Sequence, residues 1–340
     1  MNNHDKIDFV ITWVDGSDPE WIKEFNNWTP ATKKNVDIRS ERYKDFGLLK
    51  YWFRGIEKFT PWVNKVHFIT CGQKPDWLNV SSPKLNWVKH SDYIPSEYLP
   101  VFSSHPIELF INRIPGLSEK FVYFNDDMYI ISPLKESYFF KNDLPCDSGS
   151  FTVLGLGKGR CRTPHIQLNN MIEINKNFTK KEVIKNAPFK WFTPFIGKDF
   201  IKNIAYTPYN TIASISIRHY AQPFLKSTLD DVWLNCHEAL EQTAGHKFRN
   251  ELEDVNQWLF RYWQLCKGNY TPVSHRKAET MIKLSDWSNK DTNAIIHQKY
   301  SEMCIDDNTD EVPGIDYDKK MSEITKAFEQ ILPEKSTFEL

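Results

Sequence analysis

Residues Phe121–Ile131 read FVYFNDDMYII, and this stretch decides which fold the sequence predicts. Its first four residues are apolar or aromatic, which is typical of a buried β-strand. Two adjacent carboxylates, Asp126 and Asp127, follow almost directly. A buried carboxylate is costly unless it is paired, hydrogen-bonded or bound to a cation. The sequence therefore predicts that this strand ends at the rim of a pocket, where the two carboxylates meet water or a metal ion.

Two other segments repeat this order of a strand followed by a polar turn. Ile7–Val14, IDFVITWV, precedes DGSDP, and Lys65–Thr70, KVHFIT, precedes CGQ. Apolar residues at helical spacing lie between the strands, in Arg42–Phe59 and in Ser103–Ile114. This alternation predicts an α/β fold with a mostly parallel sheet and flanking helices. Such sheets bind ligands beyond the carboxyl ends of their strands, so we expect the three turns to share one edge.

The pattern changes near residue 135. We expect residues 1–135 to form the α/β core and residues 136–340 to form a mixed and helical portion that completes the active site. The alternative is one integrated catalytic domain. Helical spacing in the second portion predicts helices over Leu229–Thr243, Asp254–Cys266 and Ser322–Leu332.

Composition and charge exclude several classes of protein. Hydrophobic residues make up 40% of the chain and charged residues 26%, as in ordinary globular proteins. A net charge of -1 and a pI of about 6.8 argue against nucleic acid as a partner. The six cysteines are scattered without a CxxC pair, which argues against a zinc site. We find no apolar signal segment and no run long enough to span a bilayer, and therefore expect a cytoplasmic protein.

The Asp pair suits a reaction on phosphate that is assisted by Mg²⁺. Carboxylates are hard oxygen ligands, and Mg²⁺ usually takes one or two of them together with phosphate oxygens. No nucleophilic Ser or Cys elbow lies nearby in the sequence. From the residues alone, a structural pair that caps the next turn is an equal alternative.

Several ordered segments of the chain resemble the conserved regions of the Stealth family. They cover about Ile7 to Asn308 and read IDFVITWVDGSDPEW, RYKDFGLLKYWFRGIEKFTPWVNKVHFITCGQKPDWLN, NRIPGLSEKFVYFNDDMYI, RHYAQPF and CIDDN. That family contains bacterial capsular-polysaccharide phosphotransferases and the catalytic subunit of the lysosomal-enzyme GlcNAc-1-phosphotransferase. The resemblance implies a core similar to that of GT-A glycosyltransferases, in which residues 1–135 bind a nucleotide-sugar.

The resemblance also implies a reaction. A UDP-hexose or UDP-N-acetylhexosamine would give its sugar 1-phosphate to a hydroxyl of a growing cell-surface polysaccharide, with release of UMP and formation of a phosphodiester. A lipid-linked acceptor would require peripheral association with the inner face of the cell membrane. Two alternatives stay open: a metal-dependent glycosyltransferase that releases UDP, and a non-catalytic subunit of capsule assembly.

Roles for individual residues follow from the same resemblance. Asp127 is the first metal ligand for Mg²⁺ or Mn²⁺, with Asp126 beside it; Asp307 and Asn308 fall on a C-terminal motif that reads IDDN here and commonly LNDN in the family. The expected catalytic residues are His219 as general base, Arg249 as a fixed cation near the phosphoryl oxygens, Asp8 and Asp127. The expected substrate-binding residues are Asp15, Arg42, Gln73, His105, Arg113 and Asn125.

Overall fold

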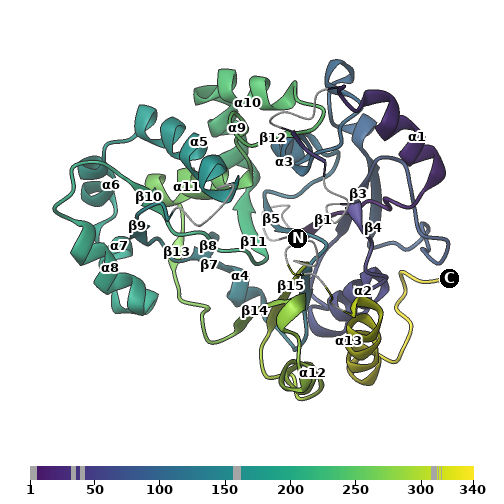
Figure 1. The fold of residues 1–340 in the computed structure, drawn as a ribbon. Coiled ribbons are helices and arrows are strands. Elements are labelled where there is room, and N and C mark those ends of the chain that lie inside the picture. Colours follow the sequence, from purple (N-terminus) through teal and green to yellow (C-terminus); the bar gives the residue numbers. More distant parts are fainter. Residues whose placement is uncertain are drawn as a thin grey trace.

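The computed structural model places a five-stranded sheet at the centre of the protein (Figure 1). The strand order is β11-β5-β1-β3-β4, and all neighbours are parallel except β11, which is antiparallel to β5. The strands are β1 (Ile7–Thr12), β3 (Val66–Thr70), β4 (Leu85–Lys89), β5 (Lys120–Phe124) and β11 (Gln222–Leu225). The structure describes residues 6–31, 36–38, 43–155, 162–307, 312, 314 and 316–340.

Both faces of this sheet are covered, which is why β1 and β5 are apolar on successive residues. Phe9 and Ile11 of β1 pack on one side against α2 (Leu49–Phe59) and α13 (Tyr317–Ile331). Val10, between them, points to the opposite side. That side is covered by α3 (Ser104–Leu109), α5 (Arg162–Asn177), α9 (Lys226–Asn235), α10 (His237–Ala244) and α11 (Gln257–Lys267).

A second sheet carries the C-terminal acidic motif to the Asp pair. It has the order β14-β15-β6, with β14 (Glu279–Lys283) parallel to β15 (Glu302–Asp306) and β15 antiparallel to β6 (Met128–Ile130). Cys304 pairs with Met128 in this register. The Ile305 N–H also donates to the Asp127 carbonyl oxygen at 2.9 Å. Segments far apart in the chain thus meet at one edge of the central sheet.

Shorter elements complete the fold. The other helices are α1 (Pro19–Trp28), α4 (Glu136–Phe139), α6 (Lys180–Asn186), α7 (Pro188–Trp191), α8 (Lys198–Tyr206) and α12 (Asn289–Ile296), and the 3-10 turns are η3 (His90–Asp92), η4 (Ser96–Tyr98), η5 (Ile111–Arg113), η6 (Pro194–Ile196) and η7 (Leu284–Asp286). The other strands are β2 (Val36–Asp37), β7 (Phe140–Lys141), β8 (Leu144–Asp147), β9 (Phe151–Thr152), β10 (Ser214–Ile215), β12 (Arg249–Asn250) and β13 (Thr271–Pro272).

The predicted fold class, an α/β fold with a mostly parallel sheet and flanking helices, is confirmed. The helix expected from Arg42 begins only at Leu49, and Arg42 itself lies outside the described residues. The helix expected over 229–243 is two helices, because the backbone of Cys236 leaves the helical conformation between α9 and α10. Among the helices that the structure describes, none is long and apolar enough to cross a membrane.

Candidate active site

A cavity of about 950 Å³ opens beyond the carboxyl ends of β1 and β5. Thr12, the last residue of β1, lines it together with Asn125, Asp126 and Asp127, which follow β5. The sheet order reverses at this point, because β1 has β3 on one side and β5 on the other. Open α/β sheets bind ligands at such a switch point, and the volume suits a small-molecule site.

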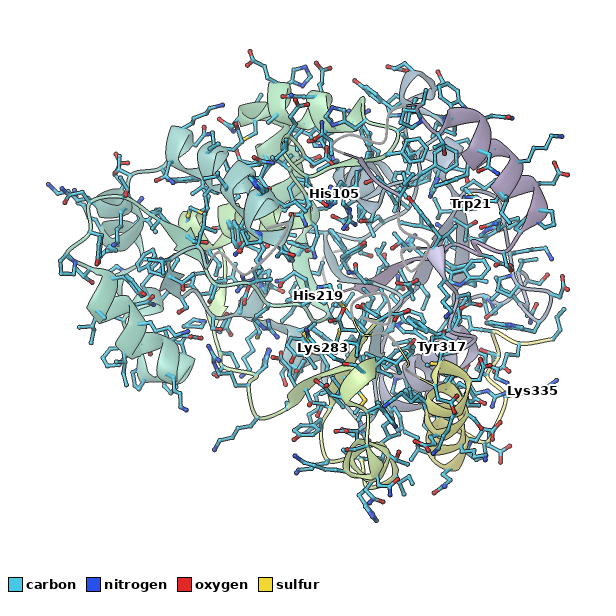
Figure 2. All side chains as sticks on the ribbon, viewed as in Figure 1. Trp21, His105, His219, Lys283, Tyr317 and Lys335 are labelled. Atoms are coloured by element: carbon cyan, nitrogen blue, oxygen red, sulfur yellow. The ribbon has the colours of Figure 1, made fainter. Side chains whose placement is uncertain are left out.

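Asp127 and His219 are in contact at the floor of this cavity. The His219 Nε2 atom lies 3.1 Å from Asp127 Oδ2, and the Cys304 thiol donates to the same oxygen at 3.4 Å. His219 comes from the segment before β11, so the antiparallel edge strand carries it to the end of β5. Figure 2 shows His219 and His105 in the middle of the molecule.

The donor atoms in this region fit a hard divalent cation. Asp127 Oδ1 and Asn125 Oδ1 are buried and have no hydrogen-bond partner within the described part of the chain. Asp306 and Asp307 also line the cavity. Ligand atoms of Asp127, His219 and Cys304 lie within 4.8 Å of one another. Oxygen donors nevertheless predominate, and Asp127 Oδ2 is already shared by the imidazole and the thiol, so Oδ1 is the oxygen left for a cation such as Mg²⁺.

The charges of these groups are coupled. Burial and the neighbouring Asp127 carboxylate raise the pKa of Asp126 to about 7. Burial opposes the charged form of His219, but the Asp127 carboxylate outweighs it and raises the pKa of the imidazole above its ordinary value. A bound cation reduces the repulsion between two such carboxylates and therefore favours the ionised form of both acids.

A buried ion-pair network fixes the chain directly before His219. The Arg218 guanidinium contacts Glu279 and lies 3.4 Å from Asp147 Oδ1. Arg261 Nε donates to Asp147 Oδ2 at 2.7 Å, and its guanidinium is fully buried. Because Arg218 is tied to two elements, the adjacent His219 has little freedom to leave Asp127. Arg218 and Glu279 also line the cavity, and sequence reasoning missed both.

Arg249 lies on another wall of the cavity, on β12. Its Nη2 donates to Ser104 Oγ at 2.9 Å, at the start of α3. Glu108, on the same helix, lines the cavity with 3% of its surface exposed and accepts from the Gln257 N–H at 3.0 Å and from the Tyr123 hydroxyl at 3.3 Å. Burial raises the pKa of Glu108 to about 7, although Gln257 and Arg249 oppose the shift.

Sequence reasoning also missed Glu108. The available signal was an acidic residue inside the apolar run of the predicted helix Ser103–Ile114. Helical periodicity alone does not show whether such a carboxylate is buried. The N-terminus of that helix is as predicted, because the Ser103 side chain accepts from the His105 N–H at 3.3 Å.

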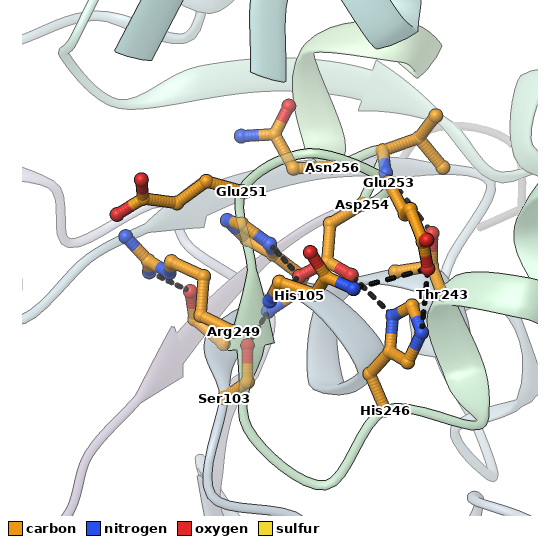
Figure 3. Close-up of polar contacts among 12 residues, drawn as sticks. Ser103, His105, Thr243, His246, Arg249, Glu251, Glu253, Asp254 and Asn256 are labelled. Atoms are coloured by element: carbon orange, nitrogen blue, oxygen red, sulfur yellow. Dashed lines mark hydrogen bonds and ion pairs between the residues drawn. The ribbon is translucent and has the colours of Figure 1, made fainter. Parts of the chain in front are cut away.

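His105 reaches the cavity as part of a His–Asp–His network (Figure 3). Its Nδ1 lies 2.8 Å from Asp254 Oδ2, and His246 Nδ1 lies 2.7 Å from the other carboxylate oxygen. Asp254 is fully buried; burial disfavours its charge, but the two imidazoles outweigh burial and lower its pKa. The hydrogen bond to Asp254 raises the pKa of His246. The network joins α3 to the segment that carries Arg249.

The structure does not bring Asp8 to the cavity. It lies at the opposite end of β1 from Thr12 and is fully buried. Its carboxylate accepts from Asn64 Nδ2 at 2.6 Å and from the Ser118 N–H at 2.8 Å, and it lies 3.2 Å from His67 Nε2. Burial opposes the charge, yet these partners lower the pKa of Asp8. A carboxylate enclosed in this way ties together the starts of three strands and lies away from the described lining of the cavity.

Three expected substrate-binding residues also lie away from the described lining of the cavity. Gln73 holds the first turn in place, because its Oε1 accepts from the Asp15 N–H at 3.0 Å and its Nε2 donates to the Asp15 carbonyl at 2.9 Å. The exposed Arg113 stacks on Trp233 at 5.2 Å from the ring centroid. Its guanidinium is thus engaged on the surface by aromatic packing. Arg42 and Asn308 lie outside the described residues.

Comparison with known proteins shows to which family the chain belongs. Two family models match the chain, Stealth protein conserved region 1 over residues 5–27 and conserved region 2 over residues 42–146. The capsular polysaccharide phosphotransferase WcwK of Streptococcus pneumoniae is 40% identical over 100% of this chain and 99% of its own length. This chain belongs to the Stealth family.

Other relatives of this Stealth protein carry related names. The receptor polysaccharide phosphotransferase WefC of Streptococcus oralis is 40% identical over 98% of this chain and 99% of its own length. The exopolysaccharide phosphotransferase cps2G of Lactiplantibacillus plantarum is 34% identical over 98% of this chain and 96% of its own length. At this similarity over nearly the whole chain, the Stealth protein is a transferase enzyme, and we do not retain the non-catalytic alternative.

Proposed function

We propose that this Stealth protein transfers a hexose 1-phosphate or N-acetylhexosamine 1-phosphate from a UDP-sugar to a hydroxyl of a growing cell-surface polysaccharide. The acceptor oxygen forms a bond to the β-phosphorus, and the bond between that phosphorus and the bridging oxygen breaks. UMP leaves with the bridging oxygen, the acceptor proton goes to the enzyme, and a sugar–phosphate–sugar diester results.

The observation that carries this proposal is the Asp127–His219 pair in a cavity that Arg249 also lines. Asp127 holds Nε2 of the ring, so Nδ1 is the nitrogen that accepts the acceptor's proton. Nδ1 has no hydrogen-bond partner among the described residues, so it is the ring nitrogen left to accept that proton. A base that is oriented by a carboxylate suits phosphoryl transfer to a hydroxyl, because the hydroxyl must lose its proton as the bond to phosphorus forms.

Arg249 stabilises the negative charge that develops on the transferred phosphate. Its guanidinium is held at Ser104 and faces the cavity from the wall formed by β12 and α3. A planar guanidinium presents several donors at once to phosphate oxygens. The buried Glu108 lies close enough to Arg249 for the two charges to interact, so we propose that Glu108 balances Arg249 until the phosphate arrives.

We propose that the metal ligands are the side-chain oxygens of Asn125, Asp126, Asp127 and Asp307. Oxygen donors of this kind fit Mg²⁺ or Mn²⁺. A divalent cation bound there would neutralise the diphosphate. Asn125, Asp126 and Asp127 come directly after β5 at the switch point of the sheet, and Asp307 comes directly after β15, so the diphosphate would lie where these two strands end.

Identifying the released nucleotide tests this proposal against its main alternative. The purified protein is incubated with Mg²⁺, a panel of UDP-sugars and a capsule-type oligosaccharide, and the products are separated by anion-exchange chromatography. We expect UMP together with a new phosphodiester signal in the phosphorus NMR spectrum. Release of UDP without that signal would mean glycosyl transfer at the anomeric carbon, and the proposed reaction would be wrong. His219→Ala is the matched negative control.

A further inference from the structure

Helix α8 (Lys198–Tyr206) exposes two isoleucines to solvent and buries two polar side chains. Asp199 is 2% exposed and Asn203 is fully buried, whereas Ile201 is 67% and Ile204 51% exposed. The Asn203 amide donates to the carbonyl oxygens of Gly149 at 2.9 Å and Trp191 at 2.7 Å. These bonds fix the helix in this orientation. A surface helix normally buries its apolar side chains, so α8 is built to meet an apolar partner.

The exposed apolar surface extends along the chain on both sides of α8. Phe189 on α7 is 85% exposed, Phe195 on η6 is 74% exposed, and Tyr209, shortly after α8, is 59% exposed. We call these three residues together with Ile201 and Ile204 the α8 surface. Isolated exposed apolar residues are common, but five of them within one short stretch mark an interaction site.

The charges of this stretch indicate which partner it meets. Residues 188–209 contain three lysines, Lys190, Lys198 and Lys202, and a single acidic residue, Asp199. Asp199 is buried and contacts Arg276, so the exposed charges here are all positive. The whole chain, in contrast, has a net charge of -1. Exposed aromatic and aliphatic side chains interspersed with lysines are the composition of a surface that lies on an anionic bilayer.

The α8 surface is also adjacent to the active site. Asp199 and Arg276, on the protein side of α8, both line the cavity. Figure 1 shows α6, α7 and α8 together at the end of the molecule farthest from α1. We infer that the α8 surface docks on an anionic lipid bilayer. Docking would bring the cavity close to an acceptor glycan held at that bilayer by a lipid; this consequence, unlike the docking, rests on the proposed function.

Vesicle binding tests the docking without any substrate. We expect the full chain to co-sediment with phosphatidylglycerol vesicles at low salt, and less with phosphatidylcholine vesicles or at high salt, where screening weakens the attraction. Replacing Lys198 and Lys202 by Glu should lower the partition coefficient at least about 25-fold, because each basic side chain near an anionic surface contributes about fivefold. F195S/I201S should reduce binding to both kinds of vesicle.

The matched control is Leu234→Ser on α9, because Leu234 is 81% exposed yet lies outside the α8 surface. It should bind vesicles as the unaltered protein does. Absence of binding to phosphatidylglycerol, or equal binding by F195S/I201S and by the control, would overturn the inference. A dimer in solution that F195S/I201S converts to a monomer, without vesicle binding, would mean that a second copy covers the surface and would also overturn it. Turnover of a soluble oligosaccharide acceptor should be unchanged in F195S/I201S, which separates failure of docking from failure of the proposed reaction.

Discussion

Replacing Glu108 by Gln should destabilise the protein at acid pH and stabilise it at alkaline pH. The carboxyl is 3% exposed, and its pKa rises from 4.5 to about 7 on folding. The folded state therefore binds the proton of the Glu108 carboxyl group more tightly than the unfolded state does. The resulting contribution to the free energy of unfolding is complete below pH 4.5 and is lost as pH rises through 7. A shift of this size corresponds to about 3 kcal/mol of unfolding free energy, at about 1.4 kcal/mol per pKa unit.

The variant lacks this titration but loses one acceptor. Two donors, the Gln257 N–H and the Tyr123 hydroxyl, point at the two carboxyl oxygens, and the amide group of Gln can accept at only one position. Losing that hydrogen bond costs about 1 kcal/mol. We thus expect E108Q to be about 1 kcal/mol less stable than the unaltered protein near pH 4.5 and about 2 kcal/mol more stable near pH 8.

Urea unfolding followed by tryptophan fluorescence measures this difference, since the chain contains 12 tryptophans. Other groups titrate alike in both proteins, so the difference between the two pH profiles isolates Glu108. The exposed Glu136 provides the control, and E136Q should follow the unaltered protein at every pH. A constant difference between E108Q and the unaltered protein from pH 4.5 to 8 would refute the raised pKa of Glu108.

Asp127→Asn should abolish both UMP release and its dependence on Mg²⁺ while the circular dichroism spectrum stays unchanged. Substantial turnover in this variant would contradict the assignment of Asp127 as a metal ligand. His219→Ala should lower kcat about 10²- to 10⁴-fold with little change in the affinity for the UDP-sugar measured by calorimetry, and an equal loss of affinity would indicate a binding role. Arg249→Lys keeps the charge but loses the planar donors, so kcat should still fall about 10²-fold. Asp254 raises the pKa of His246, so the contribution of His246 to the free energy of unfolding is complete below pH 6.5 and is lost at higher pH. His246→Gln should therefore flatten the plot of unfolding free energy against pH above pH 6.5. Identical slopes in the variant and the unaltered protein would argue against the His246–Asp254 bond.

Local patterns were enough to predict the elements that build the edge of the sheet. The segment FVYFNDDMYII contains all but the first residue of β5, the turn with Asp126 and Asp127, and β6. Ser103 is the N-cap of α3, as the polar residues before the apolar run predicted. These predictions succeed because strand burial, turn residues and helix caps depend on neighbours within a few positions of the chain.

Asp8 and Glu108 show where such reasoning stops. Propensity scales do not show which of two acids, Asp8 in a strand or Glu108 in a helix, lies at the ligand. Their positions differ because β1 runs away from Asp8 toward the cavity, whereas α3 lies beside the cavity and turns Glu108 into it. Which end of a strand and which side of a helix meet the ligand depends on strand order and helix packing, and neither is a local property.

The sequence by itself determined the α/β class, the carboxylate turn after β5 and the family to which the chain belongs. Only the tertiary structure decided that His219 lies on Asp127, that Cys304 reaches the same oxygen over a separation of 177 residues, and that Glu108 joins Arg249. The physical reason is that the first two contacts are made by the antiparallel pairing of β11 with β5 and of β15 with β6, and the third by the packing of α3 beside β12. The register of those pairs is set by packing across the whole domain.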